Sequence, residues 1–302
     1  MPLPVEYIPS QPDQAGFADF FGGWLTECRG LTLVVDCGVS GVGGVAAADM
    51  VRRLKARLGE RDLDYVLLTH IHLDHAGSLG EIFRAWPRAR AVAHEKGLCH
   101  LADPERLWAG TREVMGELAD MYGRPEPLDP DRLISHREVD LPGLRLWETP
   151  GHASHHLSFR LEEVWFPGEI AGCPHLWDGR LYNRPATPSR FSLKLALASL
   201  DRLGSEPDGP ACFPHFIKEL PFKEALLLGR RQLEFWSEFL KQPEAARQPG
   251  ESLAERLDRL ADSLWLADPL LAPLRDLPPA EIGRERFFLR NNINGLLENF
   301  EV

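Results

Sequence analysis

Three histidines and an aspartate lie within six consecutive positions of this 302-residue chain, in the order His-Ile-His-Leu-Asp-His. The apolar run Tyr65–Leu68 precedes them and a glycine follows, which predicts a short buried strand that ends in a turn. On extended chain, His70 and His72 point to the same side. Asp74 and His75 fall in the turn beyond and can face a second ion. Imidazole and carboxylate ligands suit zinc, iron or manganese, so the cluster predicts a metal site at the carboxyl end of a strand.

This cluster resembles the His-x-His-x-Asp-His signature of the metallo-β-lactamase superfamily. That family needs three more ligands, each after its own strand, and the chain offers all three in order. A Thr-Pro-Gly-His motif ends at His152, and His215 follows a late apolar run. Between them a strand-Gly-Glu turn places Glu169 where the family usually has aspartate. Four landmarks in the expected order make the resemblance specific.

The resemblance implies two divalent metal ions, with zinc favoured over iron or manganese. Two such ions lower the pKa of a shared water from about 16 to about 7, so that a bridging hydroxide becomes the nucleophile. Asp74 is then the catalytic residue that orients the hydroxide and carries its proton to the leaving group. One ion takes His70, His72 and His152, the other takes Asp74, His75 and His215, and Glu169 bridges the two.

Glutamate at position 169 has one methylene more than the usual aspartate. Three arrangements stay open, since the carboxylate can bridge both ions, bind one ion, or bind neither. Asp178 is the nearest acid that could replace it. Behind the ligands, metal-binding histidines usually donate their other N–H to a carboxylate or a carbonyl. Asp36 is the candidate for that role, with an ordinary turn aspartate as the alternative, and His175 is a candidate pocket residue.

The resemblance implies an α/β fold, a four-layer αββα sandwich with the site along one edge. Strand and helix patterns alternate twice, and each half ends in ligand residues. We divide the chain into a catalytic domain, residues 1–220, and a C-terminal helical extension, residues 221–302. Beside a strand hairpin at 16–36, we predict strands at 65–68, 91–93, 144–148, 157–161, 164–166 and 211–213, and helices at 46–58, 79–86, 193–203, 221–241 and 103–121, the last with Asp103 as its N-cap.

The C-terminal extension has apolar residues three and four positions apart, a pattern typical of amphipathic helices. Three arrangements fit such helices. They pack on the core, they pair with a second copy of the chain as a homodimer, or they form a cap over the substrate mouth.

Composition bounds the partners and the compartment. A net charge of −11 argues against nucleic acid. No apolar run reaches the roughly 18 residues that a bilayer needs. The start of the chain lacks the basic and apolar regions of a signal peptide, and five scattered cysteines fit a reducing compartment. We expect a cytoplasmic protein with a small-molecule substrate and no nucleic-acid or membrane partner.

Three reactions remain as hypotheses. Histidine at the second position of the cluster favours hydrolysis, since the oxygen-reducing diiron branch of the superfamily carries glutamate there. The first hypothesis is therefore a dinuclear hydrolase of a small thioester, ester or lactone, similar to glyoxalase II. Basic residues after the last histidine are usual in that enzyme, and Lys218 and Lys223 are a weak counterpart.

The alternative is a mononuclear iron oxygenase similar to the persulfide dioxygenases of the superfamily. It would use two histidines and one carboxylate, here His70, His152 and Glu169. The third hypothesis, a phosphodiesterase or nuclease, is disfavoured by the acidic charge and the lack of a basic, aromatic stripe.

Overall fold

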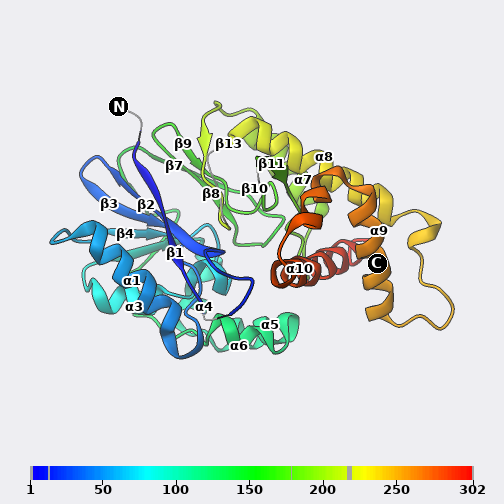
Figure 1. The fold of residues 1–302 in the computed structure, drawn as a ribbon. Coiled ribbons are helices and arrows are strands. Elements are labelled where there is room, and N and C mark those ends of the chain that lie inside the picture. Colours follow the sequence, from blue (N-terminus) through cyan, green and yellow to red (C-terminus); the bar gives the residue numbers. More distant parts are fainter. Residues whose placement is uncertain (1–2, 13, 178, 216–219, 301–302) are drawn as a thin grey trace.

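Two β-sheets face each other between layers of helices in the computed structural model (Figure 1). It describes residues 3–12, 14–177, 179–215 and 220–300. Asp178 and Lys218, named above, lie outside the described residues. Helices α1 (Val45–Leu58) and α3 (Leu79–Ala85) cover one sheet, and α7 (Leu193–Gly204) and α8 (Phe222–Leu240) cover the other. The predicted αββα sandwich is confirmed.

The first sheet has six strands in sequence order. Its first three strands form antiparallel hairpins, and from the third strand onward all neighbours are parallel. The carboxyl ends of the parallel strands therefore meet at one edge. The strands are β1 (Val5–Ser10), β2 (Phe21–Cys28), β3 (Leu31–Val35), β4 (Tyr65–Leu67), β5 (Arg90–Ala93) and β6 (Leu133–Ser135).

The second sheet has five strands in the order β13-β12-β9-β8-β7. Two successive antiparallel pairings make β7 and β9 run the same way, and β12 is parallel to β9. Their carboxyl ends thus also share an edge. The strands are β7 (Leu144–Glu148), β8 (Leu157–Leu161), β9 (Val164–Phe166), β12 (Pro210–Ala211) and β13 (Leu220–Pro221), with a separate hairpin of β10 (His175–Trp177) and β11 (Arg180–Tyr182).

Alternation along each strand explains why both sheet faces are buried. In β3, Val34 packs against helix α1, whereas Leu33 and Val35 enter the layer between the sheets. In the second sheet, Phe159 enters the same middle layer and Trp165 packs toward α7 and α8. Successive side chains of a strand point to opposite faces, so each strand contributes to two apolar layers.

The single helix predicted for residues 103–121 is wrong. A separate helix α4 (Glu95–Ala102) ends before Asp103, and Pro104 is the N-cap of α5 (Glu105–Met115). Gly116, with a φ of 58°, ends α5, and α6 (Leu118–Tyr122) follows. Glycine adopts this left-handed conformation without the steric cost that other residues carry, so it divides the predicted helix.

Other element predictions differ in smaller ways. The strand predicted at 211–213 is the shorter β12, and strands β1, β6 and the β10–β11 hairpin were not predicted. Asp74 and His75 lie in the one-turn helix α2 (Leu73–Ala76) rather than in an open turn. Short strands carry few residues from which a period can be measured, and their existence depends on the neighbour that they pair with.

Three helices follow the second sheet. Phe222 at the start of α8 stacks on Trp165 of β9, with ring centroids 3.9 Å apart. The backbone N–H of Thr187 donates to the Asn292 side chain of the last helix at 3.0 Å.

No helix in the described ranges is long and apolar enough to cross a membrane. The division at residue 220 and the homodimer stay predictions. The helices here include α9 (Leu253–Ala267) and α10 (Pro279–Leu297).

Candidate metal centre

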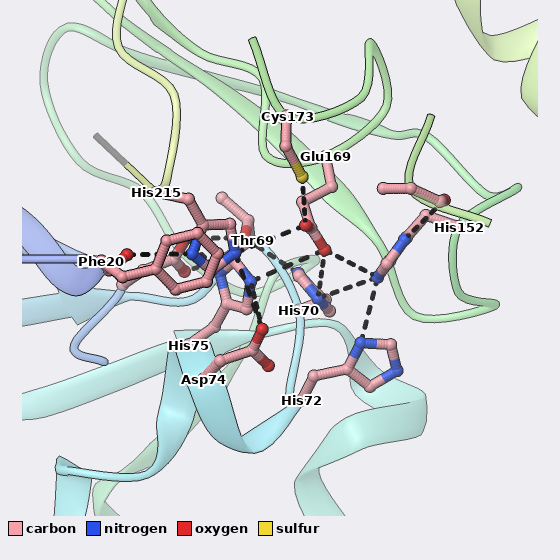
Figure 2. Close-up of polar contacts among 12 residues, drawn as sticks. Phe20, Thr69, His70, His72, Asp74, His75, His152, Glu169, Cys173 and His215 are labelled. Atoms are coloured by element: carbon pink, nitrogen blue, oxygen red, sulfur yellow. Dashed lines mark hydrogen bonds and ion pairs between the residues drawn. The ribbon is translucent and has the colours of Figure 1, made fainter. Parts of the chain in front are cut away.

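Loops that follow strands of both sheets bring the seven predicted ligand residues together (Figure 2). They form two groups, and within each group the candidate ligand atoms lie within 4.8 Å of one another. Each sheet contributes to both groups, so the centre lies along the edge that the sheets share. The first group is His70, His72, His152 and Glu169, and the second is Asp74, His75 and His215.

Ring nitrogens converge in the first group. Nε2 of His152 lies 3.1 Å from Nε2 of His70 and 3.0 Å from Nδ1 of His72. Two unprotonated ring nitrogens that face each other repel, because each presents a lone pair. A proton or a metal cation between the rings removes this repulsion, which makes the group suited to an ion with nitrogen ligands.

Backbone carbonyls fix the orientation of two of the ligand histidines. Nδ1–H of His152 donates to the carbonyl of Ala186 at 3.0 Å, and Nδ1–H of His215 donates to that of Phe20 at 3.1 Å. A neutral imidazole has only one N–H. In the neutral ring, Nε2 is then the unprotonated nitrogen, and it points into the centre, which is the state that binds a metal.

Asp36 holds one histidine of each group. Its Oδ2 accepts from Nδ1 of His75 at 2.9 Å and from the Thr69 hydroxyl at 2.8 Å. The same hydroxyl lies 3.1 Å from Nδ1 of His70, so it relays the effect of the carboxylate to that ring. Asp36 is buried with a φ of 57°, a conformation that aspartate tolerates better than most residues. Its supporting role was proposed from sequence, and this geometry agrees with it.

Nε2 of His75 is a buried polar atom with no hydrogen-bond partner in the described part of the chain. The carboxylates of Asp74 and Glu169 each stand 3.7 Å away. An orphaned buried nitrogen costs free energy unless something satisfies it. A cation between His75 and these carboxylates satisfies both charge and lone pair, so the donor set of the second group fits a metal ion.

Glu169 lies between the two groups, and its Oε2 faces His75 of the second group as well as the first group. Its Oε2 lies 3.0 Å from Nε2 of His152 and 3.6 Å from that of His70, and Oε1 lies 3.4 Å from Nε2 of His215. Despite burial, the surrounding imidazoles, His152 first, hold the pKa of this carboxyl well below its usual range. Glu169 is thus placed where it could bridge two ions, and its bridging role stays a prediction.

The turn before Glu169 needs glycine. Gly168 has a φ of 63°, and a Cβ there would lie 2.4 Å from Nε2 of His156. That nitrogen accepts from the backbone N–H of Glu169 at 3.1 Å. The thiol of Cys173 donates to Oε1 of Glu169 at 3.0 Å. His156 and Cys173 thus orient the acid, a role that the sequence did not reveal.

Protonation of the histidines differs between the groups. Burial lowers the pKa of His72 to about 4 and that of His70 well below its usual value. Burial acts the same way on His75, but the charges of Asp36 and Asp74 outweigh it and raise the pKa of His75 well above its usual value. A metal ion binds neutral imidazole, so binding at His75 releases a proton.

A second histidine cluster lies where strands β5 and β6 of the first sheet and β7 of the second sheet end. Nε2 of His136 is 3.0 Å and Nε2 of His94 is 3.5 Å from the carboxylate of Glu148. Here Nδ1 of each ring accepts a backbone N–H, from Glu95 for His136 and from Lys96 for His94. Each neutral ring therefore carries its proton on Nε2, which faces Glu148, and His136 donates that proton to Oε1. These rings thus find their partners within the protein.

His175 lies on β10, half-buried, with its ring 6.1 Å from that of Trp177. Its predicted pocket role stays a prediction.

The sequence of the chain matches a known protein family. The profile of the metallo-beta-lactamase superfamily matches residues 26–215. The metallo-beta-lactamase fold-containing protein ST1585 of Sulfurisphaera tokodaii is 33% identical over 180 residues, which are 57% of this chain and 63% of that protein. A hydroxyacylglutathione hydrolase of Stenotrophomonas maltophilia is 28% identical over 63% of this chain and 58% of its own length. The matched region therefore spans less than two thirds of the length of these relatives.

Solved structures show the same fold. An archaeal metallo-beta-lactamase superfamily protein from Sulfolobus tokodaii superposes with a TM-score of 0.69 at 24% identity, over 97% of this chain and 98% of that one. A metallo-beta-lactamase family protein from Thermus thermophilus gives a TM-score of 0.61 at 21% identity, over 97% and 92%. Both matches extend over the C-terminal helices as well as the sandwich.

Proposed function

This chain belongs to the metallo-β-lactamase superfamily, and from the geometry of its metal centre we propose that it is a dinuclear, metal-dependent hydrolase of small thioesters, esters or lactones. The observation that carries the proposal is the position of Glu169, whose carboxylate lies between the two histidine groups. One carboxylate shared by two nitrogen-rich groups is suited to hold two neighbouring cations.

The donor set fits the proposed ions. His70, His72 and His152 would hold one, Asp74, His75 and His215 would hold the other, and Glu169 would serve both. Zinc is the proposed ion, with iron and manganese compatible with the same ligands. Divalent ions bound there supply hydroxide at neutral pH, by lowering the pKa of bound water toward 7, and they polarise the carbonyl under attack.

Asp74 is the proposed proton carrier. Its Oδ2 lies 3.6 Å from Nε2 of His215 and 3.7 Å from that of His75, and its side chain is 17% exposed. Asp74 thus contacts the histidines of the second group and is also accessible from solvent. The carboxylate can accept the proton of the attacking water and hand it to the leaving thiol or alcohol.

Two findings support acyl substrates. Several relatives carry the name hydroxyacylglutathione hydrolase, at 27–28% identity. Ring contacts also surround His215, where Phe20 stacks at 4.6 Å and Phe21 lies at 5.9 Å. An apolar wall beside the ligands excludes water from an acyl group and strengthens the electrostatic interactions there.

Metal content of protein purified without added metal or chelator is the first test, followed by hydrolysis assays on thioesters, lactones and phosphodiesters. Two ions per chain together with turnover of one acyl class support the proposal. A single iron per chain with oxygen uptake on thiol persulfides would replace it with the oxygenase hypothesis.

A further inference from the structure

Arg184 is a buried charge with an incomplete set of partners. It directly follows the β10–β11 hairpin and is only 4% exposed. Its Nε donates to Oε2 of Glu285 at 2.9 Å, and its guanidinium lies over the ring of Phe288 at 4.5 Å. In residues 3–12, 14–177, 179–215 and 220–300, no hydrogen bond to its two terminal nitrogens is found. Buried arginine is normally paired through those nitrogens.

Two guanidinium groups share the carboxylate of Glu285. Arg284 donates to Oε1 of this carboxylate at 2.8 Å, and the Tyr182 hydroxyl donates to its Oε2. Oε2 therefore accepts from both Tyr182 and Nε of Arg184, and Oε1 accepts from Arg284. Glu285 makes no hydrogen bond to the terminal nitrogens of Arg184, and a second carboxylate is the acceptor that suits them.

Arg184 belongs to the wall of the metal centre. Its carbonyl accepts from the backbone N–H of Cys173 at 2.9 Å, and the Cys173 thiol contacts Glu169. Two residues further on, the carbonyl of Ala186 holds His152. The segments that neighbour Arg184 therefore position two ligands of the first group, Glu169 and His152.

Aromatic rings connect Arg184 to the second group as well. Phe288, which the guanidinium covers, stacks on Phe20 at 5.8 Å, and Phe20 stacks on His215 at 4.6 Å. Phe288 comes from α10, the last helix of the chain. The C-terminal region thus supplies part of the wall beside the centre.

Tyr122 adds an uncharged polar group to the same wall. Its ring lies 5.3 Å from that of Phe21, which in turn lies 5.9 Å from His215. The residue is 3% exposed, and its hydroxyl has no hydrogen bond to any part of the chain that the structure describes. Tyr122 and Phe288 pack in the same apolar cluster, and the Arg184 guanidinium lies over the Phe288 ring, so Tyr122 and Arg184 belong to one wall.

We propose that Arg184, assisted by the Tyr122 hydroxyl, binds a carboxylate of the substrate away from the bond that is cleaved. The guanidinium offers two parallel N–H groups that match the two oxygens of a carboxylate. The inference rests on the proposed hydrolase function and narrows it to acyl substrates that carry a carboxylate.

A matched pair of substrates tests this on the metal-loaded full chain. S-acetyl-3-mercaptopropionate carries a carboxylate, and its methyl ester does not. We expect the wild type to prefer the acid at least tenfold in kcat/KM, mainly through KM. Arg184→Gln should reduce that preference roughly 10- to 100-fold, as expected for loss of a buried charge-assisted contact.

Two further variants separate binding from structural support. Glu285→Gln breaks the same ion pair but leaves the guanidinium, so it should lower the melting temperature and keep the preference for the acid. Tyr122→Phe removes only the unpartnered hydroxyl and should reduce the preference by about three- to tenfold. Metal content is measured in each variant, so that loss of ions is not mistaken for loss of this contact.

Binding of succinate supplies a readout that needs no turnover. Succinate should raise the melting temperature of the wild type, and inorganic phosphate or dimethyl succinate should do so less. An equal rise in Arg184→Gln would mean that the anion binds at the ions alone, and would overturn the inference.

The two proposals can fail separately. Equal use of acid and methyl ester by the wild type would overturn the carboxylate site and leave the hydrolase standing. No turnover of either thioester would count against the hydrolase, while the succinate shift would still decide the binding site. If Arg184→Gln does not fold, Tyr122→Phe and the wild-type preference decide.

Discussion

Two clusters of histidine and carboxylate among the described residues differ in the hydrogen bonds that the outer ring nitrogens of their histidines make. In the metal centre, Nδ1 of His152 and His215 donates to a carbonyl, which leaves Nε2 bare. In the cluster of His94, His136 and Glu148, Nδ1 accepts a backbone N–H, which places the proton on Nε2. Both clusters have ligand-like residues at ligand-like distances.

This difference predicts that proximity alone does not define a metal site. A ring that accepts at Nδ1 can release Nε2 to a cation only by losing that hydrogen bond or by placing two donors face to face. We therefore expect the hydrogen bond on the outer side of each ring to decide which cluster binds an ion. Four experiments test the contrast.

Removing a ligand should have the largest effect. His152→Ala deletes the ring that contacts both His70 and His72, so we expect loss of at least one ion per chain and a fall in activity beyond the 10- to 100-fold typical of supporting residues. Plasma mass spectrometry and the hydrolysis assay measure the two effects. Wild-type metal content and rate in this variant would contradict the ligand assignment.

Changing Asp36 should convert His75 from a ring that donates from Nδ1, as in the metal centre, into a ring that accepts there, as in the cluster of His94 and His136. In Asp36→Asn the side-chain N–H can point at Nδ1 of His75, which forces the proton of that ring onto Nε2. We expect roughly 10- to 100-fold weaker metal binding. Titration of the metal-free protein measures the affinity, and nitrogen NMR of the imidazoles reports the tautomer. Unchanged affinity with a changed tautomer would refute the rule.

Disrupting the second cluster should leave the metal centre intact. Glu148→Gln loses one of the two acceptor contacts to His94 and His136, and because this carboxylate is partly exposed we expect a cost of about 1 kcal/mol or less. That corresponds to a melting temperature lower by roughly 2–4 °C at most. Metal content should not change. A loss of ions here would show that the second cluster also binds metal.

The smallest expected effect is a change in the stability of the protein at low pH. Burial lowers the pKa of His94 in the folded protein, so the unfolded state binds the proton more tightly. The contribution of His94 to stability is therefore present above about pH 6.5 and is lost as pH falls below it. His94→Asn keeps an N-cap for helix α4 but does not titrate. The loss of unfolding free energy between pH 7 and 5.5, measured by urea denaturation, should be smaller in this variant than in the wild type.

Much of the centre was predictable because its residues follow strands. The cluster after β4, the motif before His152 and the turn at Glu169 each occupy the chain directly after an apolar run. The division of helix 103–121 was not predicted, since a single glycine with positive φ ended it. The carbonyls of Ala186 and Phe20 were equally hidden, because any residue can present a backbone carbonyl.

The sequence by itself determined the family, the αββα sandwich and the residue types gathered at its edge, because these depend on local periodicity and on motifs of fixed spacing. Only the tertiary structure decided which nitrogen of each histidine faces inward, which carboxylate oxygen faces which group, and that Arg184 and Phe288 lie beside the same centre. Those features depend on contacts between residues far apart in the chain. Hydrogen-bond partners of this kind are set by packing, and no short segment of sequence encodes them.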